Sequence, residues 1–130
     1  MGKIFIVEDD QYVSRMYERI FRLGGHDVVF ATDGESALKV LMNANPLPGV
    51  ILLDLVLPKK SGLEVLTEVR SDTKYDSIPI AILTNSVHPE EAEKYLALGA
   101  DKYVIKMDSQ AKDVMALAEE LMSKGRSTSK

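Results

Sequence analysis

Four consecutive apolar residues lead directly into a carboxylate at Val50-Ile51-Leu52-Leu53-Asp54. Pro48 and Gly49 precede this run, and Pro58 ends the apolar segment that follows it. A run of this length between turn-forming residues is typical of a strand buried on both faces, which belongs to a parallel sheet covered by helices. The run therefore favours an open α/β fold with Asp54 at the carboxyl end of a strand, where such sheets bind their ligands.

Asp54 by itself has two interpretations. It is a nucleophile, or it ends the strand and accepts hydrogen bonds from the following turn. The residues at the ends of the other strands decide between the two.

Five β-rich runs alternate with segments whose apolar residues recur at helical spacing. The predicted strands cover residues 3–7, 27–31, 50–54, 79–83 and 103–105. Two helices are predicted to begin at capping boxes, one formed by Thr32 and Glu35 and one by Ser61 and Glu64. Pro89 suits the first position of another helix. Because a helix between parallel strands forms a right-handed crossover, the pattern predicts a doubly wound parallel sheet.

The composition fits one domain, which we expect at residues 1–124, followed by a polar tail or linker at 125–130. The net charge of −4 and the lack of a basic stripe argue against direct nucleic-acid binding. No apolar run approaches the roughly 18 residues of a membrane span, and without cysteine there is no disulfide framework. A cytoplasmic protein is the expectation. His26 and His88 have no metal or triad spacing and are predicted to lie on the surface.

The carboxyl ends of parallel strands meet at one edge of the sheet, so residues far apart in the sequence are expected there. The side chains concerned are Glu8, Asp9, Asp10, Asp54, Thr84 and Lys106. Clustered carboxylates repel one another and favour a bound cation, and oxygen ligands without histidine or cysteine favour Mg²⁺. With a lysine and a hydroxyl nearby, this set fits phosphoryl transfer with Asp54 as the nucleophile.

The order and spacing of these residues resemble the receiver domain of two-component response regulators, over residues 3–124. The matching segments are residues 7–10, residues 53–58, Gly62, residues 83–84 and residues 99–106. The resemblance implies a flavodoxin-like (βα)5 sheet of order 2-1-3-4-5. It also implies a signalling module, not an enzyme, that is a monomer or a phosphorylation-dependent homodimer.

By this resemblance, Asp54 is phosphorylated from a phosphohistidine on a sensor histidine kinase or a histidine phosphotransfer protein. Thr84 and Lys106 hold the phosphoryl oxygens. Tyr103 is the switch residue that turns inward when Thr84 moves, which alters the surface of the fourth helix, fifth strand and fifth helix.

The resemblance assigns Mg²⁺ to Glu8, Asp9, Asp54 and the backbone carbonyl of Val56. Glu8-Asp9 is preferred over Asp9-Asp10 as the metal-binding pair, and Asp10 is otherwise the N-cap of the first helix. Val56 has no polar side chain that could orient a hydrolytic water, so a long-lived phosphoryl state is expected.

The sequence departs from the family pattern at two further positions, and two alternative functions remain to be considered. Met107 stands where a proline is usual after the lysine, and Asn85 stands where a small residue is common.

A phosphatase with an aspartate nucleophile would need a second acid at the position of Val56. A receiver-like partner-binding module without phosphorylation is opposed by the complete set of Asp9, Asp54, Thr84 and Lys106.

Overall fold

The computed structural model describes residues 2–85, 89–106 and 109–126. Within these ranges, five strands form one parallel sheet in the order β2-β1-β3-β4-β5. The strands are β1 (Lys3–Val7), β2 (Asp27–Ala31), β3 (Val50–Leu53), β4 (Ile80–Thr84) and β5 (Lys102–Ile105). The predicted flavodoxin-like fold and its strand order are confirmed.

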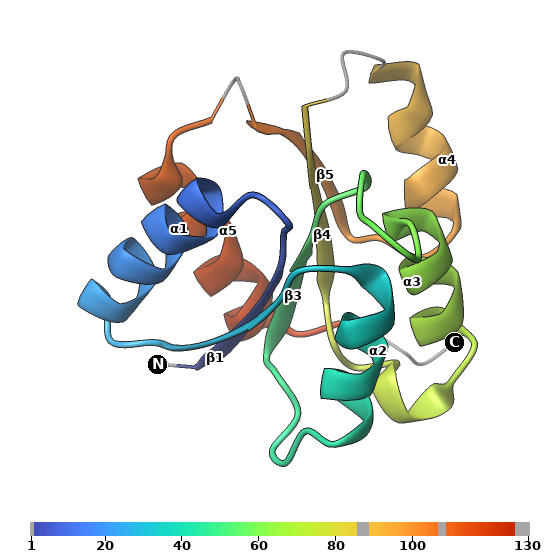
Figure 1. The fold of residues 1–130 in the computed structure, drawn as a ribbon, viewed down its shortest axis with the longest axis horizontal. Helices are drawn as coiled ribbons and strands as arrows, with labels where there is room; N and C mark the ends of the chain where they lie inside the picture. Colours follow the sequence, from blue (N-terminus) through green and yellow to red (C-terminus); the bar gives the residue numbers. More distant parts are fainter. Residues whose placement is uncertain (1, 86–88, 107–108, 127–130) are drawn as a thin grey trace.

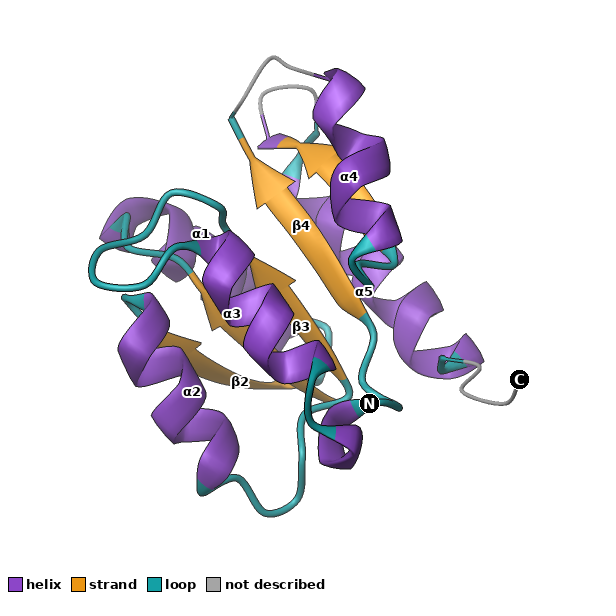
Figure 2. Cartoon of the chain, turned by 90° about the vertical axis from the view of Figure 1, so that its right-hand side faces the viewer, coloured by secondary structure: helices purple, strands orange, loops and turns teal. Residues whose placement is uncertain are grey.

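Helices cover both faces of the sheet (Figure 1). They are α1 (Gln11–Leu23), α2 (Gly34–Met42), α3 (Gly62–Arg70), α4 (Ala92–Ala97) and α5 (Ala111–Lys124), with short 3₁₀ turns η1 (Thr73–Tyr75) and η2 (Pro89–Glu91). The helices α1 and α5 lie on one face, whereas α2, α3 and α4 follow one another across the other (Figure 2). None of the helices in the described part of the chain is long and apolar enough to cross a membrane.

The apolar run of β3 contributes to two hydrophobic cores. Ile51 and Leu53 belong to the core beneath α2, α3 and α4, and Val50 and Leu52 belong to the core beneath α1 and α5. All four side chains are buried. Burial of a large aliphatic side chain contributes roughly 1.5–3 kcal/mol, so β3 needs apolar residues at consecutive positions, unlike a strand with one wet face.

The carboxyl ends of the strands gather where the predicted site lies. Val7 pairs with Leu53 and Leu53 with Ile82, whereas Thr84, two residues further along β4, pairs with Ile105. The ends of β4 and β5 therefore extend past the residues that directly follow β1 and β3, at the same edge of the sheet. This register brings Asp54 close to residues from both ends of the chain.

Two helix starts were predicted as capping boxes, and one of them is wrong. The N-cap of α2 is Asp33, not Thr32: its carboxylate accepts hydrogen bonds from the Ser36 backbone N–H at 2.7 Å and from the Ser36 hydroxyl at 2.9 Å. Both Thr and Asp are good N-cap residues, and the extended backbone at Asp33 places the cap there. The box of Ser61 and Glu64 is confirmed.

The prediction for His26 is also wrong, because its side chain is buried. Its Nδ1 accepts a hydrogen bond from the Gly2 backbone N–H at 3.1 Å, and its Nε2 lies 2.7 Å from Glu119 Oε2. A histidine with a partner for each ring nitrogen is stable in an interior position. Pro89 opens η2 and not α4 itself. His88 and Met107 lie outside the described residues.

Candidate functional site

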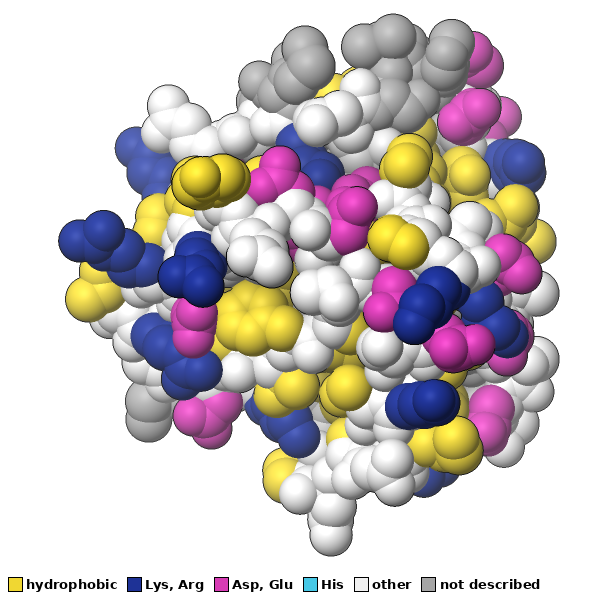
Figure 3. All heavy atoms as spheres, viewed as in Figure 1, with side chains coloured by type: hydrophobic (Ala, Val, Ile, Leu, Met, Phe, Trp, Pro, Cys, Tyr) yellow, Lys and Arg dark blue, Asp and Glu magenta, His cyan; other side chains and the backbone are white. Residues whose placement is uncertain are grey.

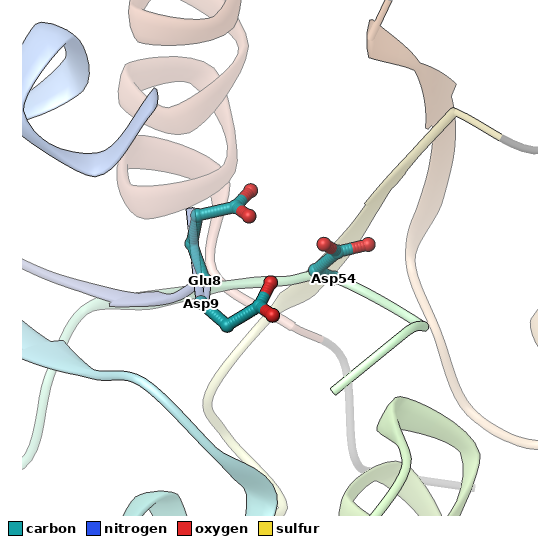
Figure 4. Close-up of side chains that lie close together, drawn as sticks. All are labelled: Glu8, Asp9 and Asp54. Carbon is teal, nitrogen blue, oxygen red and sulfur yellow. The ribbon is translucent and has the colours of Figure 1, made fainter. Parts of the chain in front are cut away.

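Three carboxylates converge at the carboxyl edge of the sheet. Glu8 and Asp9 follow β1, Asp54 follows β3, and each offers an oxygen within 4.8 Å of the others. Figure 4 shows the three side chains pointing toward one another. Glu8 and Asp54 are buried, and Asp9 is exposed. The cluster is therefore anchored in the protein on one side and reachable from solvent on the other.

The backbone that carries these acids continues the hydrogen-bond ladder of the sheet. The Glu8 N–H donates to the Ala31 carbonyl at 3.0 Å, and the Asp54 N–H donates to the Val7 carbonyl at 3.0 Å. Both acids therefore lie at positions fixed by strand pairing, whereas loop residues would be free to shift.

Asp10, the next residue, caps the N-terminus of α1. Its Oδ1 accepts hydrogen bonds from the backbone N–H groups of Tyr12 at 2.9 Å and Val13 at 3.3 Å, which makes it the N-cap of α1. Its own N–H donates to Glu8 Oε2 at 3.1 Å. The expected capping role of Asp10 is confirmed, and this geometry favours Glu8 and Asp9 as the candidate metal-binding pair.

The cation of the site is Lys106, directly after β5. Its Nζ lies 2.5 Å from Glu8 Oε1 and 3.2 Å from Asp54 Oδ2. Burial acts to lower the pKa of Lys106, but the hydrogen bond to Glu8 and the charges of Asp54 and Glu8 outweigh it and raise the pKa. The ammonium therefore stays charged and joins both buried acids.

In Glu8, the surroundings disfavour the charged form of the carboxylate. Burial raises the pKa of Glu8 above its usual range, and the bond from Lys106 offsets only part of this effect. The neighbouring charge of Asp54 raises the pKa further. One ammonium faces three carboxylates, so negative charge remains. A group of oxygen ligands with net negative charge is suited to bind a hard divalent cation.

Thr84 comes from β4, the strand that pairs with β3, and Tyr103 comes from β5, the next strand along the sheet. Thr84 ends β4 and is almost completely buried, with Ile105 as its partner in β5. Tyr103 pairs with Ile82, is half-buried and stacks on the ring of Tyr95, with centroids 5.8 Å apart. The predicted switch threonine and aromatic residue therefore occupy neighbouring strands.

The loop between β3 and α3 depends on two glycines. A Cβ at position 62 would lie 2.2 Å from the Asp54 carbonyl oxygen, and one at position 34 would lie 2.1 Å from the Lys60 carbonyl oxygen. Gly34 also donates its N–H to the Pro58 carbonyl at 3.3 Å. Sequence reasoning identified Gly62 but missed Gly34, whose role depends on a contact with a distant loop.

Val56 lies in the same loop. Its N–H lies 3.4 Å from Asp54 Oδ1 and donates to it, while its side chain is 76% exposed. Figure 3 shows acidic and basic side chains gathered near the top of the molecule, with apolar side chains around them. The loop after β3 is thus exposed at Val56, two residues beyond the buried Asp54.

Comparison with known proteins agrees with this geometry. Residues 4–118 match the family model described as the response regulator receiver domain. Response regulator Rcp1 of Synechocystis is 30% identical over 127 residues, which cover 92% of this chain and 86% of Rcp1. The relative named "probable transcriptional regulator ycf27" of Porphyridium aerugineum is 34% identical over 104 residues, but this chain spans only 41% of its length.

Solved structures show the same fold. The phosphorylated cyanobacterial phytochrome response regulator RcpA has a TM-score of 0.79 and 31% identity, with 99% of this chain and 96% of that chain covered. The Mn²⁺-bound form of response regulator Rcp1 has a TM-score of 0.78 and 29% identity, with 95% and 93% covered. With its family model, its relatives and its sheet in agreement, the chain belongs to the response regulator receiver domain family.

Proposed function

We propose that this domain is a phosphoacceptor switch in two-component signalling, with Asp54 as the phosphorylated residue. The observation that carries the proposal is the convergence of Asp54, Glu8 and Asp9 with the ammonium of Lys106 at one edge of the sheet. A carboxylate oxygen of Asp54 attacks phosphorus. The bond from phosphorus to the donor histidine nitrogen breaks, and the imidazole keeps the electron pair.

A divalent cation, Mg²⁺ in the proposal, would be held by Glu8, Asp9, Asp54 and the backbone carbonyl of Val56. When bound, it neutralises charge on the phosphoryl oxygens. The relative Rcp1 has been solved with Mn²⁺ and RcpA in a phosphorylated form, which supports this assignment for the present chain. The all-oxygen donor set and the exposure of Asp9 support a cation that keeps some of its water.

Lys106 and Thr84 would hold the phosphoryl oxygens once Asp54 is modified. Lys106 already contacts Asp54, so it needs only a small shift to reach a group attached there. The Thr84 hydroxyl is a donor at the end of the neighbouring strand. Its movement toward the phosphoryl group would leave space for Tyr103 to turn inward, and the surface of α4, β5 and α5 would change.

The partners in this proposal are a sensor histidine kinase or a histidine phosphotransfer protein and a downstream protein target. The domain acts by contact and not as an enzyme, from residues 1–124 with a tail at 125–130. It works in the cytoplasm, as a monomer or as a homodimer formed on phosphorylation.

The test is exposure of the protein to acetyl phosphate with Mg²⁺, followed by intact-mass measurement. We expect a gain of one phosphoryl group that is absent in Asp54→Ala and retained in Asp10→Asn, whose amide oxygen can still cap α1. Tandem mass spectrometry then locates the group. No gain in the wild-type protein, or an equal gain in Asp54→Ala, contradicts the proposal.

A further inference from the structure

The helix α4 is attached to the rest of the protein mainly through one side chain. Of its six residues, all described by the structure, Tyr95 is the buried one. Leu96 is 44% exposed, and Leu98, just beyond the helix, is 39% exposed. Large apolar residues on α4 therefore do not all face the sheet, and Tyr95 supplies most of the helix's packing.

Local interactions do little to hold α4 in place. Glu91, the residue before the helix, makes no side-chain capping bond to the described backbone. A helix far below about 12–15 residues is marginal on its own in water, so tertiary packing decides where it lies. The position of α4 is thus set by what Tyr95 contacts.

Tyr95 contacts the aromatic residue next to the functional site. Its ring stacks on Tyr103 of β5 with centroids 5.8 Å apart and an angle of 28° between the ring planes. Tyr95 belongs to the hydrophobic core beneath α2, α3 and α4, and the partly buried Tyr103 packs against this core. Aromatic pairs favour particular relative orientations, so a rotation of the Tyr103 ring removes the contact surface on which Tyr95 rests.

We propose that Tyr95 is a positioning residue that ties α4 to the ring of Tyr103, so that α4 shifts on the sheet when this ring turns. The attachment of α4 is a property of the fold itself. Its regulation by Asp54 rests on the proposed function, because phosphorylation is the event that would move Tyr103. Tyr95 is thereby the residue through which α4 responds to the state of the site.

Substitution at Tyr95 tests the attachment, and Tyr75 provides a matched control. Both tyrosines are buried, and each has the preceding lysine over its ring: Lys94 at 5.6 Å and Lys74 at 5.5 Å. Tyr75 lies in η1, in the same core but without the stack on Tyr103. We compare Tyr95→Leu, Tyr95→Phe and Tyr75→Leu by amide hydrogen exchange of the full chain, measured by NMR without added ligand.

Tyr95→Leu should speed exchange of the α4 amides by about tenfold, since one stacked pair is lost. Tyr95→Phe keeps the ring and should leave α4 exchange at the wild-type rate, as should Tyr75→Leu. Unchanged α4 exchange in Tyr95→Leu, or an equal rise in Tyr75→Leu, overturns the proposal. If Tyr95→Leu does not fold, Tyr103→Leu removes the same stack from the other side and should give the same rise confined to α4.

The second measurement concerns coupling to the site. With beryllofluoride and Mg²⁺, the wild-type protein should show chemical-shift changes at Thr84, Tyr103 and the α4 amides. In Tyr95→Leu, the changes at Thr84 should persist and those of α4 should be lost. A retained α4 response rejects the coupling. A wild-type protein without any response to beryllofluoride instead contradicts the proposed function, and the exchange experiment still judges the attachment of α4.

Discussion

The ammonium group of Lys106 bridges two buried carboxylates, at 2.5 Å from Glu8 and 3.2 Å from Asp54. Glu8 follows the first strand and Asp54 follows the third, whereas Lys106 follows the last strand. Because a buried charge without a partner is costly, the lysine stabilises the fold as well as the site. Stability and the proposed function are therefore expected to depend on the same three side chains.

Lys106→Met should destabilise the protein at neutral pH by about 2 kcal/mol, less than the roughly 3–5 kcal/mol of a fully enclosed pair, since the site opens to solvent. The loss should shrink as the pH falls. The pKa of Glu8 is already raised by burial and rises further without the ammonium, so the folded protein binds a proton more tightly than the unfolded chain. Urea unfolding at a series of pH values measures this.

Lys102→Met is the control, because Lys102 begins β5, the strand that Lys106 follows, but its side chain is exposed. Its substitution should change the free energy of unfolding little at any pH. Equal effects of the two substitutions, or a Lys106→Met penalty independent of pH, would show that the bridge does not balance the charge of Glu8.

Mg²⁺ should stabilise the wild-type protein, and Asp9→Asn should lose this effect. At about a hundredfold excess over the Kd, binding adds about 2.7 kcal/mol to the free energy of unfolding. Asp9 is exposed, so its substitution removes a carboxylate of the proposed metal site without disturbing the core. Thermal unfolding with and without Mg²⁺ gives the result.

Asp10→Ala distinguishes the two candidate acidic pairs. It removes the N-cap of α1 and should cost about 1 kcal/mol, yet the rise in Tm with Mg²⁺ should remain. Loss of the Mg²⁺ effect in Asp10→Ala but not in Asp9→Asn would assign the cation to the other pair.

Most of the fold could be predicted from the sequence because local patterns and long-range packing agree. The run at β3 is apolar at consecutive positions since Ile51 and Val50 enter different cores, and that requirement is visible in the sequence. The site residues could be named for a related reason: a parallel sheet places all strand ends at one edge, whatever their distance in sequence.

The features that sequence reasoning missed depend on contacts between distant segments. His26 is buried because Gly2 and Glu119 supply partners for its ring nitrogens, and nothing near His26 in the sequence indicates them. Gly34 is needed because the Lys60 backbone passes directly over it. At the start of α2 the error is one residue, since Thr32 and Asp33 are both good N-cap residues and only the backbone geometry chooses between them.

Gly62→Ala should displace the backbone that carries Asp54. A Cβ at this position would lie 2.2 Å from the Asp54 carbonyl oxygen and 2.7 Å from the Leu55 Cα, and neither atom can move alone. We expect a loss of about 2–3 kcal/mol in the free energy of unfolding, with slower modification by acetyl phosphate in the protein that remains folded. Chemical denaturation and intact-mass time courses measure the two effects.

Gly49→Ala is the matched substitution. Its Cβ would meet the side chain of Met122 at 3.0 Å, and a methionine side chain adjusts more readily than backbone. This variant should keep nearly wild-type stability and an unchanged rate of modification. If Gly49→Ala were as damaging as Gly62→Ala, the close approach to Asp54 would not be the cause.

Val56→Asn should shorten the lifetime of the phosphoryl group on Asp54. The Val56 side chain is 76% exposed beside the site, so an amide there can orient a water toward the acyl phosphate without a packing cost. We expect hydrolysis to quicken by about tenfold, below the roughly 10²–10⁴-fold of a dedicated general base, because an amide orients the water without removing its proton. Val56→Leu, which changes size but adds no polar group, should decay at the wild-type rate. Decay curves after removal of acetyl phosphate decide the matter, and equal lifetimes in Val56→Asn and the wild-type protein would mean that this position does not control access of water.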